Sequence, residues 1–358
     1  MLQDSEMSLR AERKVKAMSE WYTNDGKDND VVLSTKACIV RNIKGYNFMP
    51  RLDDKDCQSL LETIDKAIDR NVYTGGNASD LDKNTILRLT RLQILGREAS
   101  QMANPERKAF YYNDDVSLSV AVGAGEHLTV KAMAAGHDIS VYKKAEEAVL
   151  DLESKLDIAF TENYGFLTSN VRLAGTGLKV LYTVSLPAIS KTEGGIAALS
   201  QRVSQYEWSI YPFAERGEIA DSDVYIIASV NTLGITEDEL LKRGEMLIAD
   251  VIKAERALRD EIAANKKDQS ADIYGRSYGT LRYANIISRS EALQALGWLR
   301  LYHDYDDSGD IRISWNTIDK LTMDILWEPE APTRKSSQSV ASQKFRAQGI
   351  RKILKGVD

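Results

Sequence analysis

The sequence predicts an α+β fold in which an antiparallel sheet flanked by helices is followed by a small helical domain. Three observations support this class. Residues 117–122 and 127–133 alternate polar and apolar side chains on either side of a glycine turn, as an antiparallel hairpin does. Strands and helices do not alternate in the regular βαβ order of a parallel sheet. Beyond residue 273 the spacing of apolar residues is helical.

The predicted sheet domain covers residues 31–265. Small and β-branched residues predict a strand at the start of 31–41, and apolar residues at helical spacing predict a helix over 54–70. Residues 74–83 are rich in glycine, asparagine and aspartate, which predicts a loop. The remaining elements are a helix near 143–159, strands over 179–186 and 223–230, and a long helix from Thr236, which has capping-box spacing to Glu239, to about residue 265.

A helical domain is predicted at 273–328. The lysine- and aspartate-rich stretch 265–272 marks the boundary that precedes it. Ser288 and Glu291 repeat the capping-box spacing ahead of an apolar run, so a helix is expected to begin there. Another helix is predicted over 316–326.

Both ends of the chain are polar. Residues 1–30 are expected to be an N-terminal extension, with a short helix at 9–21 as the one element that its pattern allows. Residues 329–358 are expected to be a flexible linker followed by a basic helix near 342–355. Between Arg334 and Lys355 the chain carries seven lysines and arginines and no acidic residue.

The composition argues against several classes of protein. The net charge of −6 does not suit a general nucleic-acid-binding protein, which usually has a basic excess. No segment approaches the roughly 18 consecutive apolar residues of a membrane span, and the first residues lack the apolar core of a signal peptide. Cys38 and Cys57 are isolated thiols, as is typical of a reduced compartment. We therefore expect a cytoplasmic protein with no membrane or nucleic-acid partner.

Four segments, in the same order along the chain, carry a resemblance to a known family. They are VVLSTKACIVRNIKGYNF (31–48), GAGEHLTVKAM (123–133), YGFLTSNVRLAGTGLKVLYTVSLPA (164–188) and VYIIASVNTLGITEDEL (224–240). The sequence resembles the ATP:guanido phosphotransferases, or phosphagen kinases. Residues 277–296 and 346–351 are similar to the C-terminal domain of the bacterial protein-arginine kinases. The resemblance implies the guanido-kinase catalytic fold, with ATP and Mg as cofactors where nucleotide binding is retained.

The phosphate-binding arginines of the family are replaced in this chain. The five matching positions hold Lys36, Cys38, Thr129, Lys179 and Tyr211. Phosphoryl transfer depends on positioning and on neutralising charge, so the loss of such arginines is damaging. The resemblance leaves four residues as vestigial nucleotide-binding candidates, namely Ser34, Thr35, Lys36 and Lys179. It gives Arg41, which does match a family arginine, a structural role.

The catalytic carboxylate is also altered. The two consecutive glutamates of the family correspond to Ala124 and Gly125, which leaves Glu126 as the candidate catalytic residue. Adjacent strand residues point to opposite faces, so Glu126 is poorly placed to substitute for them. The reactive cysteine of the family and an asparagine that follows it correspond to Asn170 and Leu173.

These replacements favour a pseudokinase that acts as a scaffold or regulatory subunit. By resemblance, its protein partners could be an active kinase or a Clp-type unfoldase, and a homodimer is plausible. An alternative is an active ATP:guanido phosphotransferase that phosphorylates arginine side chains with altered phosphate ligands. Those ligands would be Lys36 and Lys179, with Arg172 and Arg216 nearby in the sequence.

A second alternative is a phosphoarginine- or anion-binding adaptor. The protein-arginine kinases carry an Arg-Asp-x-x-Arg-Ala motif, and residues 342–347 keep its second half as Arg346-Ala347. Arg346 could hold an anion with help from Lys344 or Arg351, because a guanidinium forms paired hydrogen bonds to such groups. The same residues are also consistent with the end of a basic helix that is exposed to solvent and binds nothing.

Three other patterns resemble known binding motifs in part. Residues 175–179 (GTGLK) lack the Walker spacing of a phosphate loop, although the resemblance places this turn beside the nucleotide. Residues 304–311 match the first eight positions of a calcium loop, but the twelfth position, normally glutamate, is Trp315. No further histidine or cysteine completes a zinc set with His127 and His137. No metal site is therefore predicted, and calcium binding at 304–315 stays open.

Overall fold

The computed structural model describes residues 21–96, 103–214, 222–265, 267–305, 311, 313–328 and 339–355. All but the last residue of the helix predicted at 9–21, and most of the predicted linker at 329–341, therefore lie outside the described residues. No helix in the described part of the chain has the length and apolarity needed to cross a bilayer.

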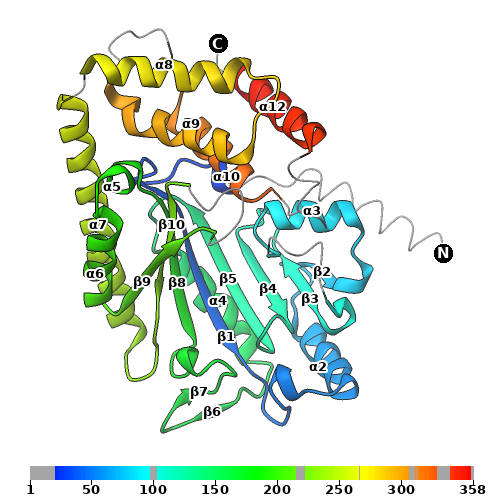
Figure 1. The fold of residues 1–358 in the computed structure, drawn as a ribbon. Helices are drawn as coiled ribbons and strands as arrows, with labels where there is room; N and C mark the ends of the chain where they lie inside the picture. Colours follow the sequence, from blue (N-terminus) through cyan, green and yellow to red (C-terminus); the bar gives the residue numbers. More distant parts are fainter. Residues whose placement is uncertain are drawn as a thin grey trace.

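An antiparallel sheet forms the centre of the molecule (Figure 1). Eight strands among the described residues pair in the order β2-β3-β4-β5-β1-β8-β10-β9, which confirms the predicted antiparallel class. The strands are β1 (Val32–Arg41), β2 (Thr74–Asn77), β3 (Ala109–Tyr112), β4 (Leu118–Val122), β5 (Leu128–Ala135), β8 (Leu178–Ser185), β9 (Trp208–Pro212) and β10 (Val224–Ser229). A separate small hairpin is made by β6 (Phe160–Thr161) and β7 (Gly165–Phe166).

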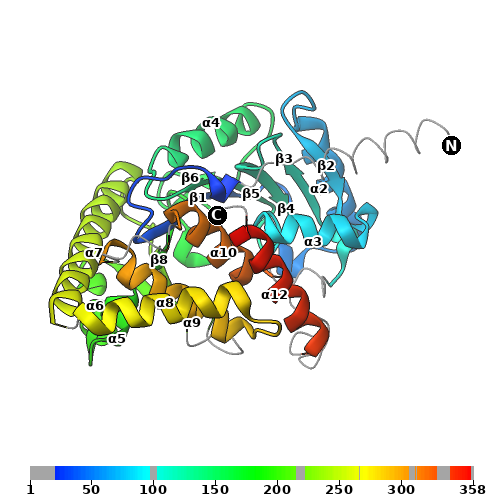
Figure 2. The same cartoon turned by 90° about the horizontal axis from the view of Figure 1, so that it is seen from above.

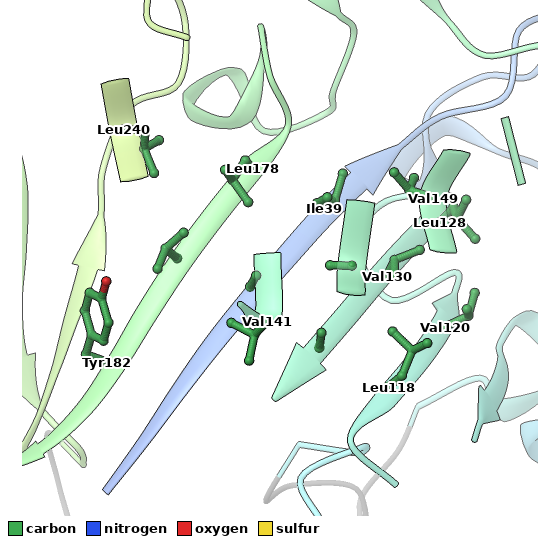
Figure 3. Packing of buried hydrophobic residues seen from close by; sticks show 14 of the residues in the cluster. Ile39, Leu118, Val120, Leu128, Val130, Val141, Val149, Leu178, Tyr182 and Leu240 are labelled. Atoms are coloured by element: carbon green, nitrogen blue, oxygen red, sulfur yellow. The ribbon is translucent and has the colours of Figure 1, made fainter. Parts of the chain in front are cut away.

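One face of the sheet is covered by helices. Successive strand residues point to opposite faces, so Ile39, Val130 and Leu178 on neighbouring strands share one side. Figure 3 shows them with Val141 and Val149 of the helix that covers this side. The helices that contribute to this hydrophobic cluster are α2 (Asp54–Ala67), α4 (Val141–Glu153), α5 (Pro187–Lys191), α6 (Gly195–Gln205) and α7 (Glu237–Asn265).

A second hydrophobic cluster joins the C-terminal helices to the opposite face of the sheet. Leu33 and Met133 of the sheet belong to it, together with Leu89 and Leu92 near α3 (Lys83–Arg91). Figure 2 shows the C-terminal helices gathered over this side of the molecule. They are α8 (Lys267–Tyr283), α9 (Arg289–Tyr302), α10 (Trp315–Leu326) and α12 (Val340–Lys355). Because the cluster draws on both parts of the chain, the division at 265–273 stays a prediction.

Most predicted elements are present, and their differences are local. The glycine-rich stretch expected to be a loop contains β2, whose backbone pairs with β3 at the sheet edge, and a short 3-10 helix. The expected boundary at 265–272 lies largely within α8. The single-turn 3-10 helices are Trp21–Thr23, Met49–Arg51, Ala78–Asp80, Pro105–Arg107, Val171–Leu173 and His303–Tyr305.

Candidate functional site

Three lysines surround one cysteine on the face of the sheet opposite α4. Cys38 on β1 pairs across the sheet with Lys131 on β5 and with Lys179 on β8. Lys36 lies two residues before Cys38 on the same strand and therefore points to the same face. Directly opposite residues of an antiparallel pair have Cβ atoms about 5 Å apart, so these side chains form one group. We call Lys36, Cys38, Lys131 and Lys179 the lysine cluster.

The remaining two of the five predicted positions lie on the same face but farther away. Thr129 is opposite Val40, two residues along β5 from Lys131. Tyr211 on β9 is opposite Ile226, near the far edge of the sheet. The family resemblance did not point to Lys131. The alternation that predicted the hairpin nevertheless puts Thr129 and Lys131 on one face of the sheet.

Lys36 is closed off by a residue from the C-terminal helices. Its side chain is 8% exposed, and its Nζ lies 4.9 Å from the ring centre of Trp327, the residue that follows α10. Phe213 packs against the same indole in an edge-to-face contact, with ring centres 5.7 Å apart. Burial, with the nearby charge of Lys131, lowers the pKa of Lys36 to about 7. Lys36 is therefore only partly charged at neutral pH.

Lys131 is held by internal hydrogen bonds. Its Nζ donates to the carbonyl oxygen of Gln93 at 3.0 Å and to that of Ile94 at 3.5 Å. These carbonyls belong to the turn after α3, in which Gln93 adopts a positive φ of 65°. Burial lowers the pKa of Lys131 as well. The ammonium group thus fastens this turn to the sheet.

Cys38 is not activated by the lysines around it. Burial raises the pKa of the thiol, and the opposing effect of Lys131, Lys36 and Lys179 does not overcome it. Nucleophilic cysteines need a lowered pKa, because the thiolate is the reactive species. Cys38 therefore remains a thiol at neutral pH.

The two predicted hydroxyl ligands are committed to the sheet. Ser34 donates to the Oγ1 of Thr183 at 3.0 Å, and Thr35 donates to the carbonyl oxygen of Gly136 at 2.7 Å. Thr35 Oγ1 also accepts from the backbone nitrogen of Asp138 at 3.1 Å. Both residues are fully buried. Their predicted nucleotide-binding role stays a prediction.

Glu126 anchors a loop. Its Oε2 accepts from the Asn42 side-chain amide at 2.7 Å and from the Ser169 backbone nitrogen at 2.9 Å, and its Oε1 accepts from the Asn170 backbone nitrogen at 3.0 Å. The carboxylate is buried. These contacts tie the segment around residues 164–175 to the end of β1. They give Glu126 a structural role, and its predicted catalytic role is untested.

Replacing Glu126 with glutamine is expected to lower the free energy of unfolding by about 1–2 kcal/mol, because an amide NH2 would face backbone N–H donors that need an acceptor. Urea unfolding followed by circular dichroism measures this loss, and hydrogen exchange at Ser169 and Asn170 should accelerate. Glu162→Gln, on the exposed hairpin beside this loop, is the matched control. Equal stability changes in the two variants would contradict the anchoring role.

Two of the three histidines, His127 and His137, make hydrogen bonds in the protein interior. His127 Nδ1 accepts from the Ile43 backbone nitrogen at 3.0 Å, its Nε2 lies 2.8 Å from the Asn47 carbonyl oxygen, and burial lowers its pKa. His137 Nε2 lies 2.7 Å from Glu245 Oε1. Within the described ranges, no group of three or more His, Cys, Asp or Glu side chains is placed to hold a metal ion.

Much of the calcium-loop pattern at 304–315 lies outside the described residues, namely 306–310 and 312. At its end, the Trp315 ring stacks on His303 with centres 4.0 Å apart.

The glycine turn at 175–179 is a tight structural turn. Gly175 has a φ of 99°, and a Cβ there would lie 2.5 Å from the carbonyl oxygen of Thr232. Arg41 supports the same turn, since its Nη1 donates to the Thr176 carbonyl oxygen at 2.9 Å and its guanidinium lies 3.3 Å from the Phe166 ring centre. Arg216 lies outside the described residues.

Arg346 is occupied by an internal ion pair. Its Nε and Nη2 donate to the carboxylate of Glu328 at 2.9 and 3.1 Å, and its Nη1 donates to the Ile287 carbonyl oxygen at 2.8 Å. Arg351 donates to the Ala284 carbonyl oxygen at 2.9 Å, whereas Lys344 is exposed. These contacts attach α12 to its neighbours. Phosphoarginine binding by Arg346 remains a prediction.

Comparison with known proteins gives a consistent result. The model of a family described as ATP:guanido phosphotransferase, C-terminal catalytic domain, matches residues 54–258. A protein-arginine kinase of Clostridium acetobutylicum is 26% identical over 290 residues, which cover 79% of this chain and 84% of the relative. A protein-arginine kinase of Clostridium tetani is 24% identical over 314 residues, which cover 86% and 90%.

The fold is similar to that of solved kinases. A lombricine kinase structure has a TM-score of 0.57 at 16% identity, with 69% of this chain and 71% of that chain covered. The substrate-free duplicated taurocyamine kinase from Schistosoma mansoni has a TM-score of 0.56 at 18% identity, with 67% and 35% covered. At these identities the likeness concerns the fold alone.

Proposed function

Because the chain belongs to the ATP:guanido phosphotransferase family, we propose that it is a kinase-like protein that no longer transfers phosphate and acts as a scaffold or regulatory subunit. The observation that carries this proposal is the contact between Trp327 and Lys36, which closes the lysine cluster with a side chain of the protein itself. The relatives named above are protein-arginine kinases, so the proposed role is one beside such a kinase.

The lysine cluster in this arrangement does not fit the triphosphate of ATP with Mg. A phosphate clamp needs cations that face the ligand and remain charged. Lys36 lies against an indole and is partly neutral at pH 7, and Lys131 is bound to two backbone carbonyls. Lysines also lack the paired donors of the arginines that they replace.

The proposal also concerns location and partners. A protein of this kind would act in the cytoplasm through contacts with other proteins, such as an active kinase or a Clp-type unfoldase, and as a homodimer. Its role would be one of binding. The hydrophobic core of the kinase fold is kept, whereas the arginines that bind phosphate in the family are replaced.

One observation favours a second candidate, an active guanido kinase with altered ligands. Lys36, Lys131 and Lys179 share one face around Cys38, so a displacement of Trp327 would present the amine of Lys36, beside that of Lys179, to an anion. Electrostatic stabilisation by such groups can be worth roughly 100-fold or more in rate for each group. The two candidates differ in a measurable product.

Incubation of the purified chain with labelled ATP, magnesium and an arginine-rich protein is expected to give no acid-labile phosphate above background. A thermal-shift titration with ATP up to millimolar concentration is expected to leave the melting temperature unchanged, since a ligand selective for the folded state must raise it.

Variants of two lysines separate true activity from contamination. Lys179→Ala removes a member of the lysine cluster, and Lys253→Ala, at an exposed position of α7, is the matched control. Label transfer that survives in the control but disappears in Lys179→Ala would replace the proposed function with the second candidate.

A further inference from the structure

An apolar groove lies between α3, α10 and α12, and its lining residues do not include those of the lysine cluster. Its volume is about 640 Å³, which is within the range of binding clefts in proteins. Figure 2 shows the three helices on the same side of the molecule. The apolar lining is formed by Leu87 from α3, Leu321 and Ile325 from α10, and Ile350 and Ile353 from α12.

Helix α12 presents a continuous open stripe to this groove. Phe345, Gly349 and Lys352 are spaced by one helical turn each, are exposed and line the groove. The Phe345 side chain is 79% exposed, which is unusual for a large aromatic residue. A Cβ added at Gly349 would meet no atom within 4 Å. A glycine inside a helix is unfavourable by about 1 kcal/mol relative to alanine, and here it leaves room for another backbone to approach.

The charge of the groove is basic. Its acidic members are neutralised within the protein, Asp324 by Arg91 at 2.8 Å and Glu328 by Arg346 at 2.9 Å. The described part of α12 contains no acidic residue, and its Lys344, Lys352 and Lys355 side chains are exposed. An occupant with negative charge would therefore gain attraction without displacing these internal pairs.

We propose that this groove binds an acidic amphipathic helix of a partner protein. Apolar side chains one turn apart would enter between α3 and α12, and flanking carboxylates would face Lys352 and Lys344. The inference rests on the proposed binding role and gives that role a class of partner.

Charge argues against the other occupants of the groove. In a symmetric dimer through this face, each copy would place its basic α12 against the same helix of the other copy. The chain's own first 20 residues contain four acidic and four basic residues, so they have no net negative charge to offer.

The test is a selection from displayed helical peptides. The library fixes leucines at positions i, i+4 and i+7 and varies the other positions among Glu, Lys, Gln and Ala. The full-length chain is the target, and selected peptides are then measured by fluorescence anisotropy. Enriched peptides are expected to carry net negative charge, because the exposed rim of the groove is basic. Lys352→Glu should weaken their binding and favour lysine-rich peptides instead.

Gly349→Leu fills the groove and is expected to weaken binding at least about tenfold, which corresponds to about 1.4 kcal/mol. The variant should remain folded, since leucine is the better helix former and the site is open. Gly275→Leu in α8 is the matched control, because a Cβ there also meets no atom within 4 Å. Its affinity for the selected peptides should match that of the unaltered chain.

Four results would overturn the proposal. The first is enrichment of neutral or basic peptides, and the second is a set of affinities that Gly349→Leu leaves unchanged. The third is a dimer in sedimentation that Gly349→Leu converts to monomers, which would assign the groove to a second copy. The fourth is binding only after removal of residues 1–20, which would assign it to the chain's own N-terminal segment. None of these depends on the phosphate-transfer assay, so the inference and the proposed function can fail separately.

Discussion

Lys36→Met is expected to raise the free energy of unfolding by about 2–3 kcal/mol at pH 7. Methionine has nearly the volume of the lysine stem and keeps the contact with Trp327 without a charge to desolvate. The pKa of Lys36 is lowered from the usual 10.5 to about 7, which sets an upper limit of about 5 kcal/mol for the unfavourable effect of its charge. The attraction of the ammonium to the indole offsets part of this amount.

The gain should depend on pH in a defined direction. Between pH 7 and pH 10.5 the unfolded chain binds more protons at Lys36 than the folded chain does, so the stability of the unaltered protein rises with pH in this window. The advantage of Lys36→Met is therefore largest at and below pH 7 and shrinks toward pH 10. The pKa of Lys131 is also lowered by burial, so the stability of the Lys36→Met variant should still rise with pH, but less steeply.

Urea unfolding of both proteins at pH 6, 7, 8 and 9 gives the two curves. Lys143→Met on the exposed side of α4 is the control and should be neutral at every pH. A loss of stability in Lys36→Met that does not vary with pH would mean that Lys36 is charged and well solvated. In that case Trp327 would not cover it in solution, and the main support for the non-catalytic proposal would be lost.

The regular elements of the fold were predictable from local patterns. The β4–β5 hairpin was predicted from the alternation of polar and apolar residues. The starts of α7 and α9 were predicted from their capping boxes. There Thr236 accepts from the backbone nitrogen of Glu239 at 3.3 Å, and Ser288 accepts from that of Glu291 at 3.0 Å. Strand β3 was missed because its four residues are all buried, so no alternation appears in AFYY. Strand β2, with two glycines, exists through its pairing with β3.

The site was predictable only in part. The resemblance assigned Lys36 and Lys179 to one nucleotide-binding site, and the strand register places both side chains on one face of the sheet. Their nucleotide-binding role itself stays a prediction. Trp327 could not be foreseen, because its contact with Lys36 depends on how α10 packs on the sheet. The sequence indicated that Glu126 is poorly placed for catalysis, because adjacent strand residues point to opposite faces of the sheet. The hydrogen bonds from Ser169 and Asn170 add a second reason, since they already occupy its carboxylate.

Asp319→Leu is expected to lower the free energy of unfolding by about 3–5 kcal/mol, because it leaves the buried guanidinium of Arg300 without its countercharge. The Arg300 and Asp319 side chains form an ion pair between α9 and α10 and are 1% and 7% exposed. Arg300 also donates to the carbonyl oxygens of Asn29 and Asp30 at 2.8 and 3.1 Å. The pair therefore joins α10, the helix that precedes Trp327, to the chain that leads into β1.

The double variant Arg300→Met/Asp319→Leu tests this explanation. Replacing both members of a buried pair by apolar residues is often nearly neutral, so most of the lost stability should return, apart from about 1–2 kcal/mol for the Asn29 carbonyl left without a donor. The Asp30 carbonyl oxygen still accepts from Arg259 at 2.7 Å. Asp272→Ala in the exposed Arg276–Asp272 pair of α8 is the control and should change stability by less than about 1 kcal/mol. Urea unfolding of all four proteins gives the comparison. If the double variant is no more stable than Asp319→Leu, the single variant's loss comes from repacking around α10, and the attachment of Trp327 over Lys36 must be sought in the apolar contacts of the second cluster.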